Sequence, residues 1–182
     1  VEERVGPFGY RAFVDSAPVM ERALARKAGL GWIGKNAMLL NPRAGSLFFL
    51  GELYVDLPLP IDAPFEEEHC GSCSACRTAC PTGAIVEDRV VDARACISYL
   101  TIELFGAIPE RYREAMGNRV FGCDDCQLVC PFTRFTRPTA EADFAPRHDL
   151  DRASLVSLFA WSEEEFLDKT AGIPIRRIGY ER

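Results

Sequence analysis

The sequence predicts an α+β fold in which a mixed helix–strand segment is followed by a metal-binding segment and a short helical tail. Three observations support this prediction. All eight cysteines lie within residues 70–130, and prolines at 58, 60 and 64 mark an extended linker before them. After residue 131 the pattern that indicates secondary structure becomes weaker. We therefore expect three units over residues 1–65, 66–135 and 136–182. At 48% hydrophobic and 26% charged, the 182 residues suit one compact unit or two small ones.

Composition and the amino-terminal residues exclude several classes of protein. No apolar run reaches the roughly 18 residues of a membrane span, and the first residues lack both a signal peptide and an initiating Met. We expect a cytoplasmic protein without a membrane segment, in a chain that starts mid-protein. A net charge of -6 argues against indiscriminate nucleic-acid binding, because phosphate neutralisation needs a surplus of Lys and Arg.

The first segment is predicted to contain one helix, a glycine-rich loop and one strand. Pro18 suits the first turn of a helix over residues 18–28, and Gly29 suits its left-handed cap. Residues 31–36 then form the loop. The aromatic apolar run over residues 46–55 is too short for most helices and predicts a buried strand.

Four further helices are predicted, over residues 92–104, 109–115, 153–160 and 163–169. Pro109 can open the second of them, because its missing N–H is not needed in a first turn. Ser162 and Glu165 form a capping box for the last one.

The first cysteine group has the spacing of bacterial two-cluster ferredoxins. Cys70, Cys73 and Cys76 are followed by Cys80 and Pro81 without a mismatch to that pattern. Three thiolates of such a loop bind one four-iron, four-sulfur cluster, and the fourth is a ligand of a second cluster. The chain has no secretory signal, so thiolate ligands are favoured over disulfides.

The second cysteine group lacks the first member of the ferredoxin pattern. Cys123, Cys126 and Cys130 precede Pro131, and Cys96 is the unused cysteine that can complete the set. The ferredoxin crossing rule assigns one cluster to Cys70, Cys73, Cys76 and Cys130, and the other to Cys80, Cys96, Cys123 and Cys126. A pair of zinc sites is the alternative. His69 is interpreted as a polar neighbour of the ligands, since eight cysteines already satisfy two clusters.

Longer strings around these cysteines resemble epoxyqueuosine reductase. They are CGSC at residues 70–73, CPTGAI at 80–85, CISYLT at 96–101, GNR at 117–119 and GCDDCQLVCP at 122–131. The earlier half contributes FVDSAP at 13–18, AGLGW at 28–32 and GKN at 34–36. The related cobalamin-dependent reductive dehalogenases share the cysteine motifs, but the segments of the earlier half favour epoxyqueuosine reductase.

The resemblance implies a function and its cofactors. The family uses cobalamin and two four-iron, four-sulfur clusters to reduce epoxyqueuosine to queuosine at the wobble position of tRNA. Residues 1–65 would be the carboxyl-terminal part of the α/β cobalamin-binding catalytic domain, because the family has a further amino-terminal portion. The resemblance further implies a monomer that takes electrons from a flavodoxin or ferredoxin type of donor.

The resemblance also assigns roles to individual residues. Asp15 matches the residue that serves the family as proton donor and as a contact to cobalamin. Without the family, the same residue would be interpreted as a helix cap. Asn36 and Leu39 match corrin contacts, although Gly34 and Asn36 alone would predict a plain turn. Ser98 and Asp124 lie next to the cysteines of the second cluster, where that cluster is expected to face cobalamin.

Arginines supply the candidate contacts to tRNA phosphates, because guanidinium groups match phosphate geometry. They are Arg111, Arg113, Arg119, Arg176, Arg177 and Arg182. Two other functions remain open from the residues alone. One is a cobalamin-dependent reductase of a small molecule, which would not bind tRNA. The other is a non-catalytic ferredoxin-type electron carrier, which would leave the first 65 residues without a role.

Overall fold

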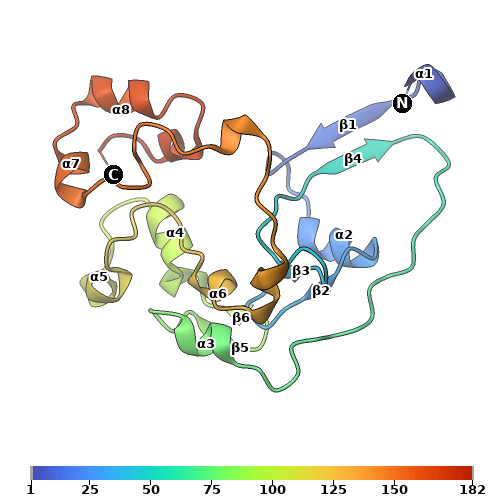
Figure 1. The fold of residues 1–182 in the computed structure, drawn as a ribbon, viewed down its shortest axis with the longest axis horizontal. Coiled ribbons are helices and arrows are strands. Elements are labelled where there is room, and N and C mark those ends of the chain that lie inside the picture. Colours follow the sequence, from blue (N-terminus) through green and yellow to red (C-terminus); the bar gives the residue numbers. More distant parts are fainter. Residues whose placement is uncertain (1, 182) are drawn as a thin grey trace.

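The computed structural model describes residues 2–181 of the chain, which is built from short helices and two-stranded sheets (Figure 1). Its first part opens with helix α1 (Glu2–Val5) and contains an antiparallel ribbon of β1 (Tyr10–Phe13) and β4 (Glu52–Val55). Figure 1 shows the ribbon projecting away from the rest of the chain. Within the described residues, no helix is long and apolar enough to cross a membrane.

The predicted buried strand over residues 46–55 is wrong in extent and in burial. Only Glu52–Val55 forms a strand, because only this end of the apolar run pairs with β1. Leu53 and Tyr54 are 57% and 48% exposed. A two-stranded ribbon has no second layer of its own to cover its faces, so its apolar side chains stay at the surface.

The predicted first helix is confirmed in part as α2 (Glu21–Lys27). It begins three residues later than Pro18, because the chain first makes a tight turn in which the Val19 N–H donates to the Ala17 carbonyl at 2.8 Å. Gly29 adopts a positive φ of 74°, as its predicted capping role requires.

A small hairpin of β2 (Trp32–Ile33) and β3 (Leu39–Leu40) follows α2. Gly31 makes the hairpin possible, because a Cβ at this position would lie 2.0 Å from the Leu40 carbonyl oxygen. Trp32, Leu39 and Leu40 are each at most 3% exposed, so this hairpin forms the core of the first part.

The middle part contains the cysteines and most of the remaining elements. They are α3 (Ala75–Ala79), β5 (Ile85–Glu87), β6 (Val90–Val91), the 3-10 turn η1 (Ala93–Ala95), α4 (Ile97–Ile102), α5 (Glu110–Met116), α6 (Asp125–Leu128) and η2 (Pro131–Phe135). Ile97, Leu100 and Met116 form its buried apolar cluster.

Two helix predictions fall in this middle part. The single helix over residues 92–104 is wrong, because Cys96 is extended, with φ -70° and ψ 124°, and separates η1 from α4. The helix over residues 109–115 is confirmed with a shift of one residue. Pro109 is the residue before α5 and not its first residue.

The tail comprises η3 (Ala142–Phe144), α7 (Leu155–Phe159), α8 (Glu163–Lys169) and η4 (Pro174–Ile178), and it lies beside α4 and α5 in Figure 1. The bounds predicted for α8 and its capping box are confirmed, since Ser162 and Glu165 bond each other's backbone N–H. The helix predicted over residues 153–160 is confirmed in shorter form as α7, with Ser154 as its cap.

Candidate iron–sulfur site

The two cysteine groups have the same local structure. Cys76 lies in α3 and Cys126 in α6, and these two short helices pack against each other. Cys80 and Cys130 each follow their helix in an extended conformation, with ψ of 113° and 128°. The prolines that come next disfavour helical backbone at the preceding residue, so both cysteines leave their helix at an equivalent point.

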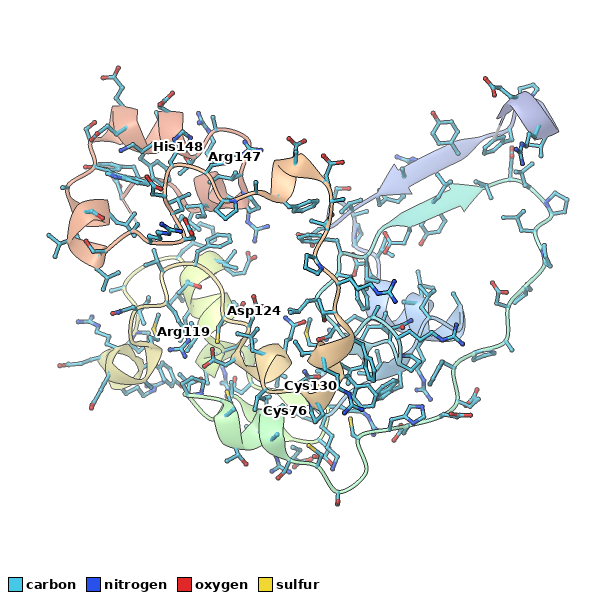
Figure 2. The ribbon with its side chains drawn as sticks, viewed as in Figure 1. Cys76, Arg119, Asp124, Cys130, Arg147 and His148 are labelled. Atoms are coloured by element: carbon cyan, nitrogen blue, oxygen red, sulfur yellow. The ribbon has the colours of Figure 1, made fainter. Side chains whose placement is uncertain are left out.

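One cavity of about 150 Å³ brings four of the cysteines together. It is lined by Cys70, Cys73, Cys76 and Cys130, with Lys35, Asn36, Leu40, His69, Ala75, Pro131 and Phe132. Figure 2 shows Cys76 and Cys130 next to each other at this place, although 54 residues separate them in sequence. The four thiols are those that the crossing rule assigns to the first cluster, and we call them the first thiol set.

The other four cysteines are Cys126 and three that lie near it. Burial, followed by the charges that Cys123, Cys76, Cys80 and Cys96 carry when ionised, raises the pKa of the Cys126 thiol to about 12. Electrostatic effects of this kind require short separations. Cys80, Cys96 and Cys123 therefore lie near Cys126, and we call these four the second thiol set; Cys76 of the first set also lies near Cys126.

The other thiols whose pKa is shifted have neighbours within the same two sets. Burial raises the pKa of both Cys76 and Cys130, and in each case the charges of Cys70 and Cys73 contribute. Burial also raises the pKa of Cys123. These thiols are protonated near neutral pH, so binding of a metal or cluster must displace their protons.

Four thiols border one cavity, which is the arrangement that a four-iron, four-sulfur cluster requires. Within residues 2–181, no three His, Cys, Asp or Glu side chains are gathered closely enough to hold one ion. A zinc site needs four ligands on one centre, whereas a four-iron, four-sulfur cluster needs one thiolate at each of four separate corners. The cavity bordered by the first thiol set fits the second requirement.

Hydrogen bonds hold Cys96 near the group that it is predicted to join. The Thr82 hydroxyl donates to the Ala95 carbonyl at 2.6 Å, which joins the segment after Cys80 to the residue before Cys96. The Thr101 hydroxyl donates to Ile97 at 2.7 Å and accepts the Gly122 N–H at 2.9 Å. Together they join three segments that are distant in sequence.

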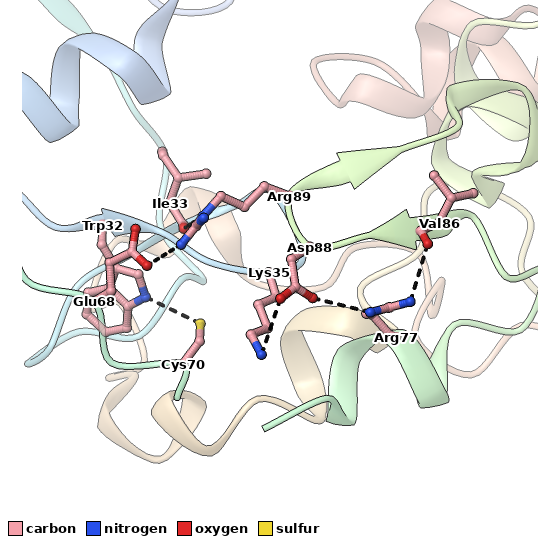
Figure 3. Close-up of polar contacts among 9 residues, drawn as sticks. All are labelled: Trp32, Ile33, Lys35, Glu68, Cys70, Arg77, Val86, Asp88 and Arg89. Carbon is pink, nitrogen blue, oxygen red and sulfur yellow. Dashed lines mark hydrogen bonds and ion pairs between the residues drawn. The ribbon is translucent and has the colours of Figure 1, made fainter. Parts of the chain in front are cut away.

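The first part of the chain reaches the thiols through the β2–β3 hairpin and the loop between its strands (Figure 3). The Trp32 indole N–H donates to Cys70 Sγ at 3.5 Å. Lys35 Nζ lies 3.4 Å from the Asp88 carboxylate, and Arg89 Nε donates to the Ile33 carbonyl at 3.1 Å. Sequence reasoning missed these contacts, because no local pattern pairs a hairpin with residues 38 to 56 positions later.

The structure places the predicted corrin contacts Asn36 and Leu39 inside the protein. Asn36 is 4% exposed; its amide donates to the Cys126 carbonyl at 3.1 Å and accepts the Met38 N–H at 3.2 Å. Leu39 is 3% exposed. Asn36 therefore fastens its loop to the second cysteine group, and both side chains have roles within the fold.

Ser98 and Asp124 lie at the second thiol set. Ser98 Oγ is 3.8 Å from where a Cβ on Gly122 would lie, so it is beside the segment that leads to Cys123. Asp124 is exposed, and its carboxylate accepts a 2.9 Å hydrogen bond from the Gln127 amide. Both therefore keep the proximity to this set that the sequence predicts.

Asp15 lies in the loop after β1 with a positive φ of 51°, a conformation that is uncommon outside glycine. Its side chain is 88% exposed, and Oδ2 lies 3.7 Å from Arg177 Nη1. The interpretation of Asp15 as a helix cap is wrong. The residue before α2 is Met20, and no side chain caps that helix.

The candidate phosphate-binding arginines mostly contact other parts of the chain. Arg119 bonds the Asp125 carboxylate, which raises the Arg119 pKa, and donates to the Met116 carbonyl. Further intramolecular contacts run from Arg113 to Ile108, from Arg176 to Leu167, from Arg177 to Glu103 and Asp15, and from Arg111 to the Tyr112 ring. Arg182 lies outside the described residues.

Comparisons with known proteins agree with this geometry. The profile of a 4Fe-4S double cluster binding domain matches residues 69–133. Over all 182 residues the chain is 65% identical to epoxyqueuosine reductase from Pseudomonas aeruginosa and covers 50% of that protein. The chain spans about half the length of the curated relatives it matches.

Solved structures of epoxyqueuosine reductases share the fold. One holds a tRNA-Tyr stem loop modified with epoxyqueuosine; its TM-score is 0.88 at 35% identity, over 95% of this chain and 46% of that one. Another, from Bacillus subtilis, has a catalytic aspartate loop swung out of the active site. Its TM-score is 0.87 at 34% identity, over 98% of this chain and 47% of that one. The resemblance predicted from the sequence is confirmed.

Proposed function

We propose that this chain is part of an epoxyqueuosine reductase, which reduces epoxyqueuosine to queuosine in tRNA. The observation that carries the proposal is the division of eight thiols into two sets, in a chain 65% identical to such an enzyme. In this proposal residues 1–65 are part of the cobalamin-binding catalytic domain, residues 66–135 are the two-cluster module and residues 136–182 are a helical tail.

The two thiol sets are the proposed ligands of two four-iron, four-sulfur clusters. Cys70, Cys73, Cys76 and Cys130 would bind one, and Cys80, Cys96, Cys123 and Cys126 the other. Each cluster then takes a ligand from both groups, so loading would tie α3 to α6. The clusters would pass single electrons from an external donor to the catalytic domain.

Cobalamin is proposed on the resemblance, and the residues of this chain fit it unequally. Ser98, Asp124 and Asp15 have side chains that are exposed or only partly buried. Asn36 and Leu39 are buried and support the loop from within, so they do not fit direct contacts. When bound, cobalamin supplies the reducing centre that acts on the epoxide carbon.

Asp15 is the proposed acid that gives a proton to the epoxide oxygen as the C–O bond breaks. A carboxyl group can do this near neutral pH only in a poorly solvated pocket. Here Asp15 is exposed beside Arg177. The relative whose catalytic aspartate loop is swung out offers a precedent for an outward position of such a loop, from which Asp15 would move inward when substrate binds.

Conversion of epoxyqueuosine-containing tRNA by the full-length protein tests the proposal. We expect Asp15→Asn to keep both clusters and lower turnover about a hundredfold to ten-thousandfold, the usual range for loss of a positioned acid. Asp56→Asn is the matched control, because the Asp56 carboxylate accepts the Gly9 N–H at the other end of the ribbon.

Two results would contradict these proposals separately. A wild-type protein with both clusters and cobalamin that does not convert the tRNA would contradict the function. Normal turnover of Asp15→Asn would leave the function standing and assign the acid to another residue.

A further inference from the structure

Trp32 lies outside the cysteine motifs and is directly bonded to one of their sulfurs. Its indole N–H donates to Cys70 Sγ at 3.5 Å across 38 residues of sequence. The side chain is 1% exposed, so water cannot satisfy this N–H. A buried indole N–H normally finds an acceptor, and the acceptor here is a proposed cluster ligand.

The orientation of the indole is fixed from several sides. Phe65 stacks on it with ring centroids 5.8 Å apart, and His69 and Phe132 meet it edge-on at 4.8 Å. The backbone of Trp32 pairs with Leu40 in the hairpin. Neither ring rotation nor strand movement can redirect the N–H without disrupting this packing, so its direction toward Cys70 is a built feature.

The position of the indole relative to the cavity is also informative. His69, Phe132 and Cys70 line the cavity of the first thiol set, and Trp32 packs against the first two of these residues. The indole itself is not part of the lining. It therefore approaches the Cys70 sulfur from outside the cavity and leaves the space for the cluster free.

We infer that Trp32 sets the reduction potential of the cluster bound by the first thiol set. An N–H that donates to a ligand sulfur favours the reduced form, because one-electron reduction adds a negative charge at the cluster and its ligands. The hydrogen bond therefore raises the potential of this cluster. No side chain of residues 1–65 makes an equivalent sulfur bond to the second set in the described structure, so the effect falls on one cluster.

This inference rests on the proposed clusters, and it can be tested without turnover. The test uses full-length protein reconstituted under anaerobic conditions, with iron content measured first and both cluster potentials then measured by redox titration monitored by electron paramagnetic resonance. Trp32→Phe removes the N–H and keeps an aromatic ring.

We expect the equilibrium constant for reduction of one cluster to fall about three- to tenfold, which is about 28 to 59 mV for one electron. The other potential and the iron content should stay unchanged. Trp161→Phe is the matched control, because it makes the same substitution in the tail, where Trp161 contacts Lys169. Phe65→Leu controls for altered packing against the indole, because Phe65 stacks on Trp32 but does not line the cavity.

A variant with closer shape guards against loss of the cluster in Trp32→Phe. Benzothienylalanine introduced at position 32 by amber suppression replaces the N–H with sulfur and keeps the bicyclic ring. It should give the same drop in one potential. Unchanged potentials at full iron content, or an equal drop in Phe65→Leu, would overturn the inference. Absence of iron from the wild-type protein would instead overturn the proposed function.

Discussion

The two thiol sets are built from the same motif but are supported by different parts of the chain. The first set lines an open cavity whose wall includes Lys35, Asn36 and Leu40 from the first segment. The second set is supported mainly from within the middle segment, through Thr82, Thr101 and the apolar cluster around Leu100. Cys73 of the first set is exposed, whereas burial raises the pKa of Cys126 of the second set to about 12.

In the proposed function, this difference would give the two clusters separate roles. The first set has an exposed thiol and is closer to solvent, which suits the entry of electrons from an external donor. The second set contains the more deeply buried Cys126 and lies next to Ser98 and Asp124, which in the proposed enzyme would suit the transfer of electrons to the catalytic centre. Variants that each affect one set show whether the two sets can be perturbed separately.

The largest effect is expected from removing a ligand that lies far from the group it serves. Cys96→Ala should lower the iron content from about eight to about four per chain, because the second set loses one corner. Metal analysis after anaerobic reconstitution measures this directly. Ser98→Ala, two residues along the chain, should retain all the iron, and full iron in Cys96→Ala would show that Cys96 is not a ligand.

An intermediate effect is expected at Asn36, which joins the first segment to the second cysteine group. Asn36→Ala leaves the Cys126 carbonyl and the Met38 N–H without their partner, at a cost of about 1–3 kcal/mol in the free energy of unfolding. Urea unfolding of the reconstituted protein measures this cost.

The matched control for Asn36 is Asn41→Ala, in the same segment. The Asn41 amide also donates to a carbonyl and accepts a backbone N–H, but its partners are Leu30 and Arg43 of the first segment. It should leave the cluster spectrum unchanged. If Asn36→Ala also left the free energy of unfolding and the cluster spectrum unchanged, Asn36 would not couple the first segment to the second cysteine group.

The smallest effect is expected in the tail, away from both sets. Ser162→Ala removes the cap of α8 and should lower stability by about 1 kcal/mol without changing iron content. Thermal unfolding together with metal analysis measures both quantities. Loss of iron in this variant would mean that the tail supports the clusters and would contradict this expectation.

Local signals were sufficient where neighbouring residues decide the structure. The capping box of α8, the cap at Gly29 and the matching geometry of the two Cys–Pro endings could all be predicted from adjacent residues. Predictions failed where distant contacts decide. The predicted helix over residues 92–104 breaks because Cys96 is extended between two helical turns, and the run over residues 46–55 is exposed because the described chain provides no layer to cover it.

The site shows the same limit of sequence reasoning. The cysteine spacing predicted which thiols come together, because the motif carries the spacing of a known cluster fold. Sequence could not predict that Trp32 would bond Cys70, or that Asn36 would turn inward to Cys126, because both contacts depend on how the hairpin packs. Nor could it predict that Asp15 would face Arg177, which lies 162 residues later.

Iron and sulfide content in two double variants tests the crossed division of the thiols most directly. Cys80→Ala with Cys96→Ala removes two ligands of the second set, so about four irons should remain. Cys96→Ala with Cys130→Ala removes one ligand from each set, so iron should be lost from both. If the second double variant kept about four irons and the first kept none, each cysteine group would bind its own cluster and the crossed sets would be contradicted.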